Sequence, residues 1–215
     1  MSLLGIFGGT FDPIHYGHLR TAFELRLALG MNELRFVPAG DPPHRSAPLA
    51  DASVRFRMVE AAIADQPGFV ADDRELHRAG PSYTLTTLLE FRQEFPREPI
   101  CLVVGMDAFL GLPEWHRWRE ILPLAHLVVA HRPGWSAPTE GILGRLLQEH
   151  RARAPVELKQ SSGGRIYVHP VTQLEISSTE LRELVAAGRD PRYLVPDVVR
   201  DTIRNTGCYT GPKAR

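Results

Sequence analysis

Gly8-Gly9-Thr10-Phe11-Asp12-Pro13-Ile14-His15-Tyr16-Gly17-His18-Leu19 follows the apolar run Leu3 to Phe7 and leads into a stretch with helical periodicity. A strand that turns through glycines into a helix N-terminus presents free backbone N–H groups and the positive end of the helix dipole, which favour phosphate. His15 and His18 are three residues apart, so they project from the same side of a first helical turn. Gly17 between them leaves room for a ligand. The segment therefore predicts a phosphate-binding site at a strand-to-helix junction.

Other interpretations of this segment are weaker. Two histidines at this spacing can be zinc ligands, but no glutamate stands between them as in His-Glu-x-x-His, and no third ligand is near in the sequence. The turn has neither the Gly-Lys-Ser/Thr ending of a P-loop nor the third glycine of a dinucleotide-binding fingerprint. Scattered surface histidines are the remaining alternative. The coincidence of strand, glycines, Asp-Pro, paired histidines and helix start favours a functional site.

Composition sets the class of protein. The 215 residues, 43% of them hydrophobic, predict one globular domain over residues 1–215. The 25 basic and 25 acidic residues cancel, so we expect no nucleic-acid or membrane partner. Cys101 and Cys208 are too few for a disulfide framework, and the chain lacks a basic leader and a bilayer-length apolar stretch. We predict a cytoplasmic protein; the sequence is compatible with a homo-oligomer without defining one.

Short apolar runs alternate with longer amphipathic ones. Strands are expected at Leu3 to Phe7, Leu34 to Pro38, Ile100 to Val104, Leu127 to Ala130 and Ile166 to His169. Helices are expected at Arg20 to Leu29, at Ala52 to Ala64 with Asp51 as N-cap, and at Tyr83 to Phe95 with Ser82 as N-cap. This alternation predicts an α/β fold, a parallel sheet with helices on both faces and ligands at the carboxyl ends of its strands.

The last part of the chain, residues 176–215, is expected to be helical. Ser177-Ser178-Thr179 supplies capping hydroxyls to an amphipathic run that ends at Gly188, which makes a second helix N-terminus rich in donors. A final helix is expected at Asp197 to Thr206, between Pro196 and Gly207. Residues 151–165, with Ala154-Pro155 and Ser161-Ser162-Gly163-Gly164, have the composition of a flexible connection or a disordered segment.

Two motifs carry a family resemblance. The chain resembles the nucleotidyltransferase superfamily with His-x-Gly-His and Ile-Ser-Ser-Thr-x-x-Arg motifs, in Gly9 to His18 and in Ile176 to Arg182. The resemblance implies a Rossmann-like fold and transfer of a nucleoside monophosphate from ATP or CTP to a phosphate-bearing acceptor, with release of pyrophosphate.

Further motifs resemble the family of bacterial nicotinate-nucleotide adenylyltransferases. They are Phe36-Val37-Pro38, Pro42-Pro43-His44-Arg45, Pro81-Ser82-Tyr83-Thr84-Leu85, Gly105-Met106-Asp107, Pro113-Glu114-Trp115 and Arg132-Pro133-Gly134. That family condenses nicotinate mononucleotide with ATP to give deamido-NAD. The chain departs from its pattern at Arg45, where lysine is usual, and at Met106, where a small residue is usual. Arg45 keeps the charge but changes its hydrogen-bond geometry, and Met106 bears on packing near the adenine.

The resemblance also implies roles for single residues. Catalytic roles fall to His15, His18 and Arg182. ATP contacts fall to Gly8, Gly9, Thr10, Phe11, His18, Gly105, Asp107, Ile176, Ser177, Ser178, Thr179 and Arg182. Acceptor contacts fall to His44, Arg45, Tyr83, Thr84, Trp115 and Arg132. Mg²⁺ is expected with ATP, held mainly by phosphate and water, so no metal-ligating side chain is assigned.

Several alternatives stay open at the level of sequence. Asp107 has a helix N-cap as its alternative interpretation, and Tyr83 and Trp118 are interpretable as ordinary core or surface aromatics. Nicotinamide mononucleotide or pantetheine phosphate could replace the acceptor. From another class, the chain could be a non-catalytic nucleotide-binding regulator, although such a protein would be expected to have lost one of its two phosphate-binding motifs.

Overall fold

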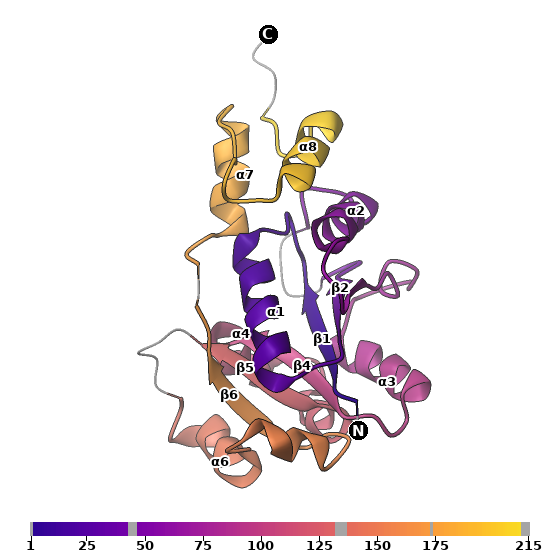
Figure 1. The fold of residues 1–215 in the computed structure, drawn as a ribbon, viewed down its shortest axis with the longest axis vertical. Coiled ribbons are helices and arrows are strands. Elements are labelled where there is room, and N and C mark those ends of the chain that lie inside the picture. The colour runs from indigo at the N-terminus through magenta and orange to yellow at the C-terminus, as the bar shows by residue number, and fades with distance from the viewer. Residues whose placement is uncertain (1, 43–46, 132–136, 173, 212–215) are drawn as a thin grey trace.

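The chain folds around one parallel sheet, as the sequence predicts (Figure 1). This computed structural model describes residues 2–42, 47–131, 137–172 and 174–211. The sheet has six strands in the order β3-β2-β1-β4-β5-β6, and every neighbouring pair is parallel. Its strands are β1 (Leu4–Gly9), β2 (Glu33–Pro38), β3 (Phe69–Ala71), β4 (Ile100–Gly105), β5 (His126–His131) and β6 (Ile166–Pro170).

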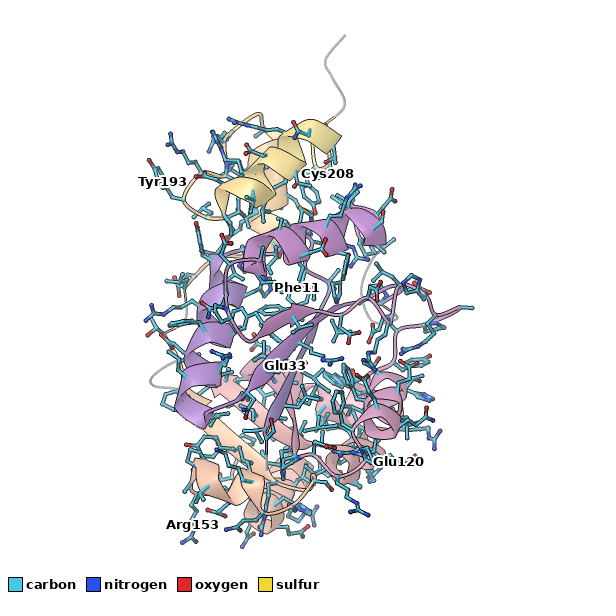
Figure 2. All side chains as sticks on the ribbon, turned by 45° about the vertical axis from the view of Figure 1, so that its right-hand side comes forward. Phe11, Glu33, Glu120, Arg153, Tyr193 and Cys208 are labelled. Carbon is cyan, nitrogen blue, oxygen red and sulfur yellow. The ribbon has the colours of Figure 1, made fainter. Side chains whose placement is uncertain are left out.

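Helices lie on both faces of this sheet. They are α1 (Tyr16–Leu29), α2 (Ala52–Ile63), α3 (Thr84–Glu94), α4 (Met106–Leu110), α5 (Ile121–Leu124), α6 (Gly141–His150), α7 (Ser178–Ala186) and α8 (Asp197–Thr206), with short 3₁₀ helices at Leu112–Glu114, Trp118–Glu120 and Pro155–Lys159. Helices α7 and α8 stand at one end of the molecule and α6 at the other (Figures 1 and 2). The helical C-terminal part is therefore where the sequence places it.

Strand alternation builds two separate cores. In β4, Cys101 and Val103 face a first core shared with α1, α2, α7 and α8, whereas Leu102 and Val104 face a second core shared with α3 to α6. Successive side chains of a strand point to opposite faces, so a strand buried on both sides is apolar throughout. This explains why the runs at β4 and β5 are continuous rather than alternating in hydrophobicity.

The sheet parts between its two central strands. β1 pairs with β4 only from Leu4–Ile100 to Ile6–Leu102, while β1 stays paired with β2 as far as Gly9–Pro38 and β4 stays paired with β5 as far as Gly105–Ala130. The strand order also reverses here, because β1 is followed by β2 on one side and β4 lies on the other. Such a switch point is where open α/β sheets bind ligands, at the carboxyl ends of the strands.

The structure differs from the expected local structure at several places. Strand β3 was not predicted, because a three-residue, half-buried strand is too short to show a hydrophobic period. Helix α1 begins at Tyr16, four residues before the expected Arg20 to Leu29, and this start agrees with the first helical turn expected at His15 and His18. Ser82 is not the N-cap of α3, a place taken by Tyr83, because the Ser82 hydroxyl instead accepts hydrogen bonds from the amides of Gly40 and Asp41, at 3.0 and 3.1 Å. Asp51 does precede α2, but its carboxylate makes no capping hydrogen bond.

The connection over residues 151–165 is an ordered, packed segment and not a flexible one. It contains the 3₁₀ helix Pro155–Lys159, and the Leu158 side chain is wholly buried. Arg92 donates to the Ser162 carbonyl at 3.0 Å, and the amide of Arg165 donates to His126 Nδ1 at 3.1 Å. The long-range contacts of this segment are invisible in its composition.

Within the described ranges, no helix has the length and apolar character that crossing a bilayer requires. Both cysteines are free thiols, Cys101 in the core and Cys208 half-buried after α8.

The fold predicts unequal effects for two leucines of α1. Leu25 is wholly buried in the first core, whereas Leu27 is 59% exposed on the same helix. Leu25→Ala should lower the free energy of unfolding by about 2–5 kcal/mol, since it leaves a cavity. Leu27→Ala is the matched control and should change it by about 0.5 kcal/mol or less. Urea denaturation of both variants decides this, and equal effects would contradict the proposed packing of α1.

Candidate active site

The two motif histidines meet at the start of α1, just beyond the parting of β1 and β4. His15 is the N-cap residue of α1, and its ring stacks on that of His18 with 3.7 Å between centroids. Gly17 is what makes this possible, because a Cβ built there would lie 2.9 Å from His15 Nδ1. The sequence predicted room for a ligand at Gly17; the structure uses that room for the His15 ring.

Burial fixes the protonation state of His15. The residue is 5% exposed, and desolvation lowers its pKa to about 4. The imidazole is therefore neutral at pH 7 and carries one N–H donor and one acceptor nitrogen. His18 is half-buried, and its ring makes T-shaped contacts with the rings of Phe11 and Phe7, whose centroids are 5.1 and 6.2 Å away.

Phe11 supports the site from behind. Its side chain is 2% exposed and belongs to the first core, so only its backbone can face a nucleotide. The residue has a left-handed backbone with φ of 47°. A bulky residue rarely adopts this conformation, and it turns the chain sharply between β1 and Asp12.

The second motif is joined to the first by direct hydrogen bonds. Ser178 Oγ donates to the Pro13 carbonyl at 3.1 Å, across 165 positions of sequence. Arg182 donates to the Asp12 carbonyl at 2.8 Å and to Thr179 Oγ1 at 3.2 Å. Ser177 caps α7 and accepts from the Thr179 amide, as predicted. The N-termini of α1 and α7 are thus held side by side, and Ile176, half-buried, anchors the segment before α7 on the first core.

Two glycines flank the parting of the sheet without a structural need for glycine. A Cβ built at Gly8 or at Gly105 meets nothing within 4 Å, and neither residue has a positive φ. Their small size leaves the carboxyl ends of β1 and β4 open to a ligand's approach. At Gly9, by contrast, a Cβ would lie 3.0 Å from the Phe11 ring. Thr10 follows on directly, half-buried.

The residues that follow β4 differ in their exposure to solvent. Asp107 is exposed in the first turn of α4, whose N-cap is Gly105, so the N-cap alternative for Asp107 is wrong. Met106 is 6% exposed and packs in the second core, which places this family departure in the interior. Trp118 also belongs to the second core, which confirms the alternative interpretation of this residue as a core aromatic.

The predicted acceptor residues are only partly gathered. Tyr83 stacks on His116 with ring centroids 4.2 Å apart, and Thr84 begins α3 next to it. Trp115 is half-buried and packs on the edge of the second core. His44, Arg45 and Arg132 lie outside the described residues.

Sequence reasoning missed four residues of this region. His116 was overlooked beside Trp115, although an aromatic ring next to a predicted stacking residue was a usable signal. Asp12 was quoted only as part of the motif. Arg55 and Tyr209 carry no local signal, since both act on segments far away in the chain.

The described donors suit phosphate better than a bare metal ion. Imidazoles, hydroxyls, a guanidinium and helix N-terminal amides surround the junction of α1 and α7. No three His, Cys, Asp or Glu side chains come together in a manner that could hold a metal ion, among residues whose positions are described.

Comparison with known proteins agrees with this geometry. A model of the family described as cytidylyltransferase-like matches residues 6–184. A protein of Aeromonas hydrophila named "Probable nicotinate-nucleotide adenylyltransferase" is 49% identical over 206 residues, which are 96% of each chain. One of the same name from Methylococcus capsulatus is 48% identical over 96% of this chain and 99% of that one. The structure of Plasmodium falciparum nicotinic acid mononucleotide adenylyltransferase with NaAD has a TM-score of 0.74 at 16% identity, covering 97% and 98% of the two chains, a likeness of fold.

The buried His15 predicts a pH dependence of stability. Its pKa falls from 6.5 to about 4 on folding, so between these values the unfolded chain binds the proton first. The free energy of unfolding should therefore decrease as pH falls from 6.5 toward 4, by about 3 kcal/mol from this group. His15→Gln should remove that share of the decrease, measured by denaturation at several pH values. His77→Gln, at a side chain 74% exposed, is the control, and an equal effect of both variants would contradict the assignment to His15.

Proposed function

Because the chain belongs to the cytidylyltransferase-like family and, within it, to the nicotinate-nucleotide adenylyltransferases, we propose that it transfers the adenylyl group of ATP to nicotinate mononucleotide. The products are pyrophosphate and deamido-NAD, an intermediate of NAD biosynthesis. The observation that carries this proposal is the contact of the His-x-Gly-His segment with the N-terminus of α7 at the parting of β1 and β4. The cytoplasm stays the predicted location.

The reaction needs positioning more than covalent chemistry. An oxygen of the acceptor's 5′-phosphate attacks the α-phosphorus of ATP, a new P–O bond forms, and the bond to the β-phosphate oxygen breaks with departure of pyrophosphate. No nucleophilic side chain takes part, so the protein must align the two oxygens and stabilise charge on the phosphoryl group.

The described residues divide this work. In the proposal, His18 and the neutral His15 direct N–H donors at the reacting phosphates. Ser178, Thr179 and Arg182 hold the β- and γ-phosphates at the positive end of the α7 dipole. Arg182 keeps further donors for a ligand, because a guanidinium has five, and the Thr179 hydroxyl accepts from Arg182 and keeps its own O–H. The Ser178 hydroxyl donates to Pro13, so in the proposal Ser178 offers its backbone amide at the start of α7.

A divalent metal accompanies ATP in this class of reaction, and we propose Mg²⁺. An ion that keeps several waters and uses phosphate oxygens needs few protein ligands. Mg²⁺ would reduce repulsion between the phosphates when bound, and Mg-ATP is treated as the substrate.

The acceptor is proposed to bind near the start of α3. The Thr84 amide and hydroxyl, beside Tyr83 at a helix N-terminus, favour the nicotinate carboxylate, and the Trp115 face suits a cationic pyridinium ring. His44, Arg45 and Arg132 remain predicted contacts for the phosphates of acceptor or ATP.

An acceptor panel tests the proposed reaction. Purified protein with ATP and Mg²⁺ should release pyrophosphate with nicotinate mononucleotide, and more slowly with nicotinamide mononucleotide, which lacks the carboxylate charge. Pantetheine phosphate is the third arm. Absence of pyrophosphate with the acid acceptor, or turnover with pantetheine phosphate alone, would overturn the assignment.

His18 gives the matching mechanistic test. His18→Ala should lower kcat by about 10²- to 10³-fold, the loss expected for one preorganised donor to the transition state. Circular dichroism should show a preserved fold, and His77→Ala at an exposed position should keep wild-type turnover. Near-normal kcat in His18→Ala would remove this residue from the mechanism.

A further inference from the structure

One buried arginine ties together the loops at the ends of β1 and β2. Arg55 of α2 is 1% exposed. Its guanidinium donates to the Thr10 carbonyl after β1, at 2.7 Å, and to the Ala39 carbonyl after β2, also at 2.7 Å. Its Nε donates to the Ala50 carbonyl at 3.1 Å. The charge thus serves three backbone segments, and no carboxylate hydrogen-bonds to it in the described part of the chain.

A buried carboxylate, Asp12, hydrogen-bonds to the same residue, Ala50, as this arginine. Asp12, 4% exposed, accepts from the Ala50 amide at 3.2 Å and from the Leu49 amide at 2.9 Å. Ala50 therefore gives its N–H to Asp12 and its carbonyl to Arg55. Asp12 also offers its own carbonyl to Arg182 of the second motif.

The third member comes from the last described residues of the chain. The Tyr209 hydroxyl donates to Asp12 Oδ1 at 2.6 Å, across 197 positions of sequence. Tyr209 is 7% exposed and, like Phe11 beside Asp12, has a left-handed backbone, with φ of 67° and 47° respectively. Such a conformation of a bulky residue is unfavourable and persists only where the surroundings hold it, often at functional sites. Figure 2 labels Cys208, the residue before Tyr209, next to helix α8.

On the other side, the network reaches the start of α3. Gly40, whose carbonyl lies 3.4 Å from the Arg55 guanidinium, donates its amide to Ser82 Oγ, as does Asp41. Ser82 directly precedes Tyr83 and Thr84. A chain of hydrogen bonds between described residues thus runs from Tyr209 through Asp12, Ala50 and Arg55 to two loops. The first is the loop at Thr10 after β1, the ATP-side loop, and the second is the loop at residues 39–41 after β2, the acceptor-side loop, which Ser82 joins to the start of α3.

We propose that Asp12, Arg55 and Tyr209 are positioning residues, which set the spacing between the ATP-side loop at Thr10 and the acceptor-side loop at Ala39 to Asp41. The proposal rests on the proposed function. None of the three needs to touch a substrate. Their effect falls on the alignment of two bound substrates, where small misplacements cost much rate, so it should appear in kcat more than in either KM.

Tyr209→Phe is the mildest test, because it removes one hydroxyl and keeps the ring. We expect kcat per folded molecule to fall about 10-fold or more, with both KM values within about threefold of wild type. Arg55→Lys keeps the charge but cannot serve all three segments, and it should show the same pattern more strongly. Tyr193→Phe is the matched control, since Tyr193 also has a left-handed backbone but is 79% exposed and points away from the molecule (Figure 2). It should change neither constant.

Hydrogen exchange provides a readout that does not depend on turnover. In Tyr209→Phe, the amides of Leu49 and Ala50 should exchange faster than in wild type, while those of β4 should not change. Unchanged kcat in a folded variant, a rise confined to one KM, or unchanged exchange at Leu49 and Ala50 would each overturn the proposal. If the wild-type protein turns over no acceptor, the proposed function fails, and the exchange result still decides whether Tyr209 holds the loops.

Discussion

The parting of β1 from β4 is the constraint on which the site depends. The two strands stop pairing after Ile6 and Leu102, three residues before either strand ends. Helix α1 leaves β1 toward the first core and α4 leaves β4 toward the second, so the connections diverge to opposite faces of the sheet. A parallel sheet whose order reverses at this point leaves backbone groups at both carboxyl ends without strand partners. Those groups, with the N-termini of α1 and α7, are what a triphosphate can use.

The sequence predicts the parts of this arrangement that arise from local rules. Continuous apolar runs identify the central strands because both of their faces are buried, and Ser177 is recognisable as a cap from its neighbours alone. Prediction fails where a distant partner decides. Ser82 has the ideal chemistry for an N-cap, but two amides of the loop after β2 engage its hydroxyl, and no feature of its own segment indicates this.

The candidate site, too, combines features that local sequence predicts with features that depend on distant residues. Both halves of the proposed phosphate-binding region are motifs of consecutive residues, so they are visible in sequence. That they meet is not a consequence of strand order, because β6, which precedes α7, is three strands away from β1; the hydrogen bonds of Ser178 and Arg182 to Pro13 and Asp12 show it. The residues that hold the two motifs together cannot be identified from the sequence. Arg55 resembles any charge on an amphipathic helix, and Tyr209 lies in a short tail after Gly207. Only the folded chain shows that both side chains are buried and bonded to loops at the carboxyl edge of the sheet.

Arg55 has a counterpart that explains why arginine is used in such places. At the opposite edge of the sheet, Arg92 donates to the carbonyls of Phe95 and Glu98 at 2.8 Å each, and to that of Leu124. Irregular segments at strand ends cannot pair their carbonyls in a ladder, and an unpaired buried carbonyl costs about 1–3 kcal/mol. A planar guanidinium can donate to several carbonyls at once. It thereby removes the cost of leaving them unpaired and fixes the distances between them. Lysine would satisfy fewer of them and leave the spacing looser. At the amino edge Arg92 holds the segments that precede β4 and β5, whereas at the carboxyl edge Arg55 holds the loops where the two substrates are proposed to meet.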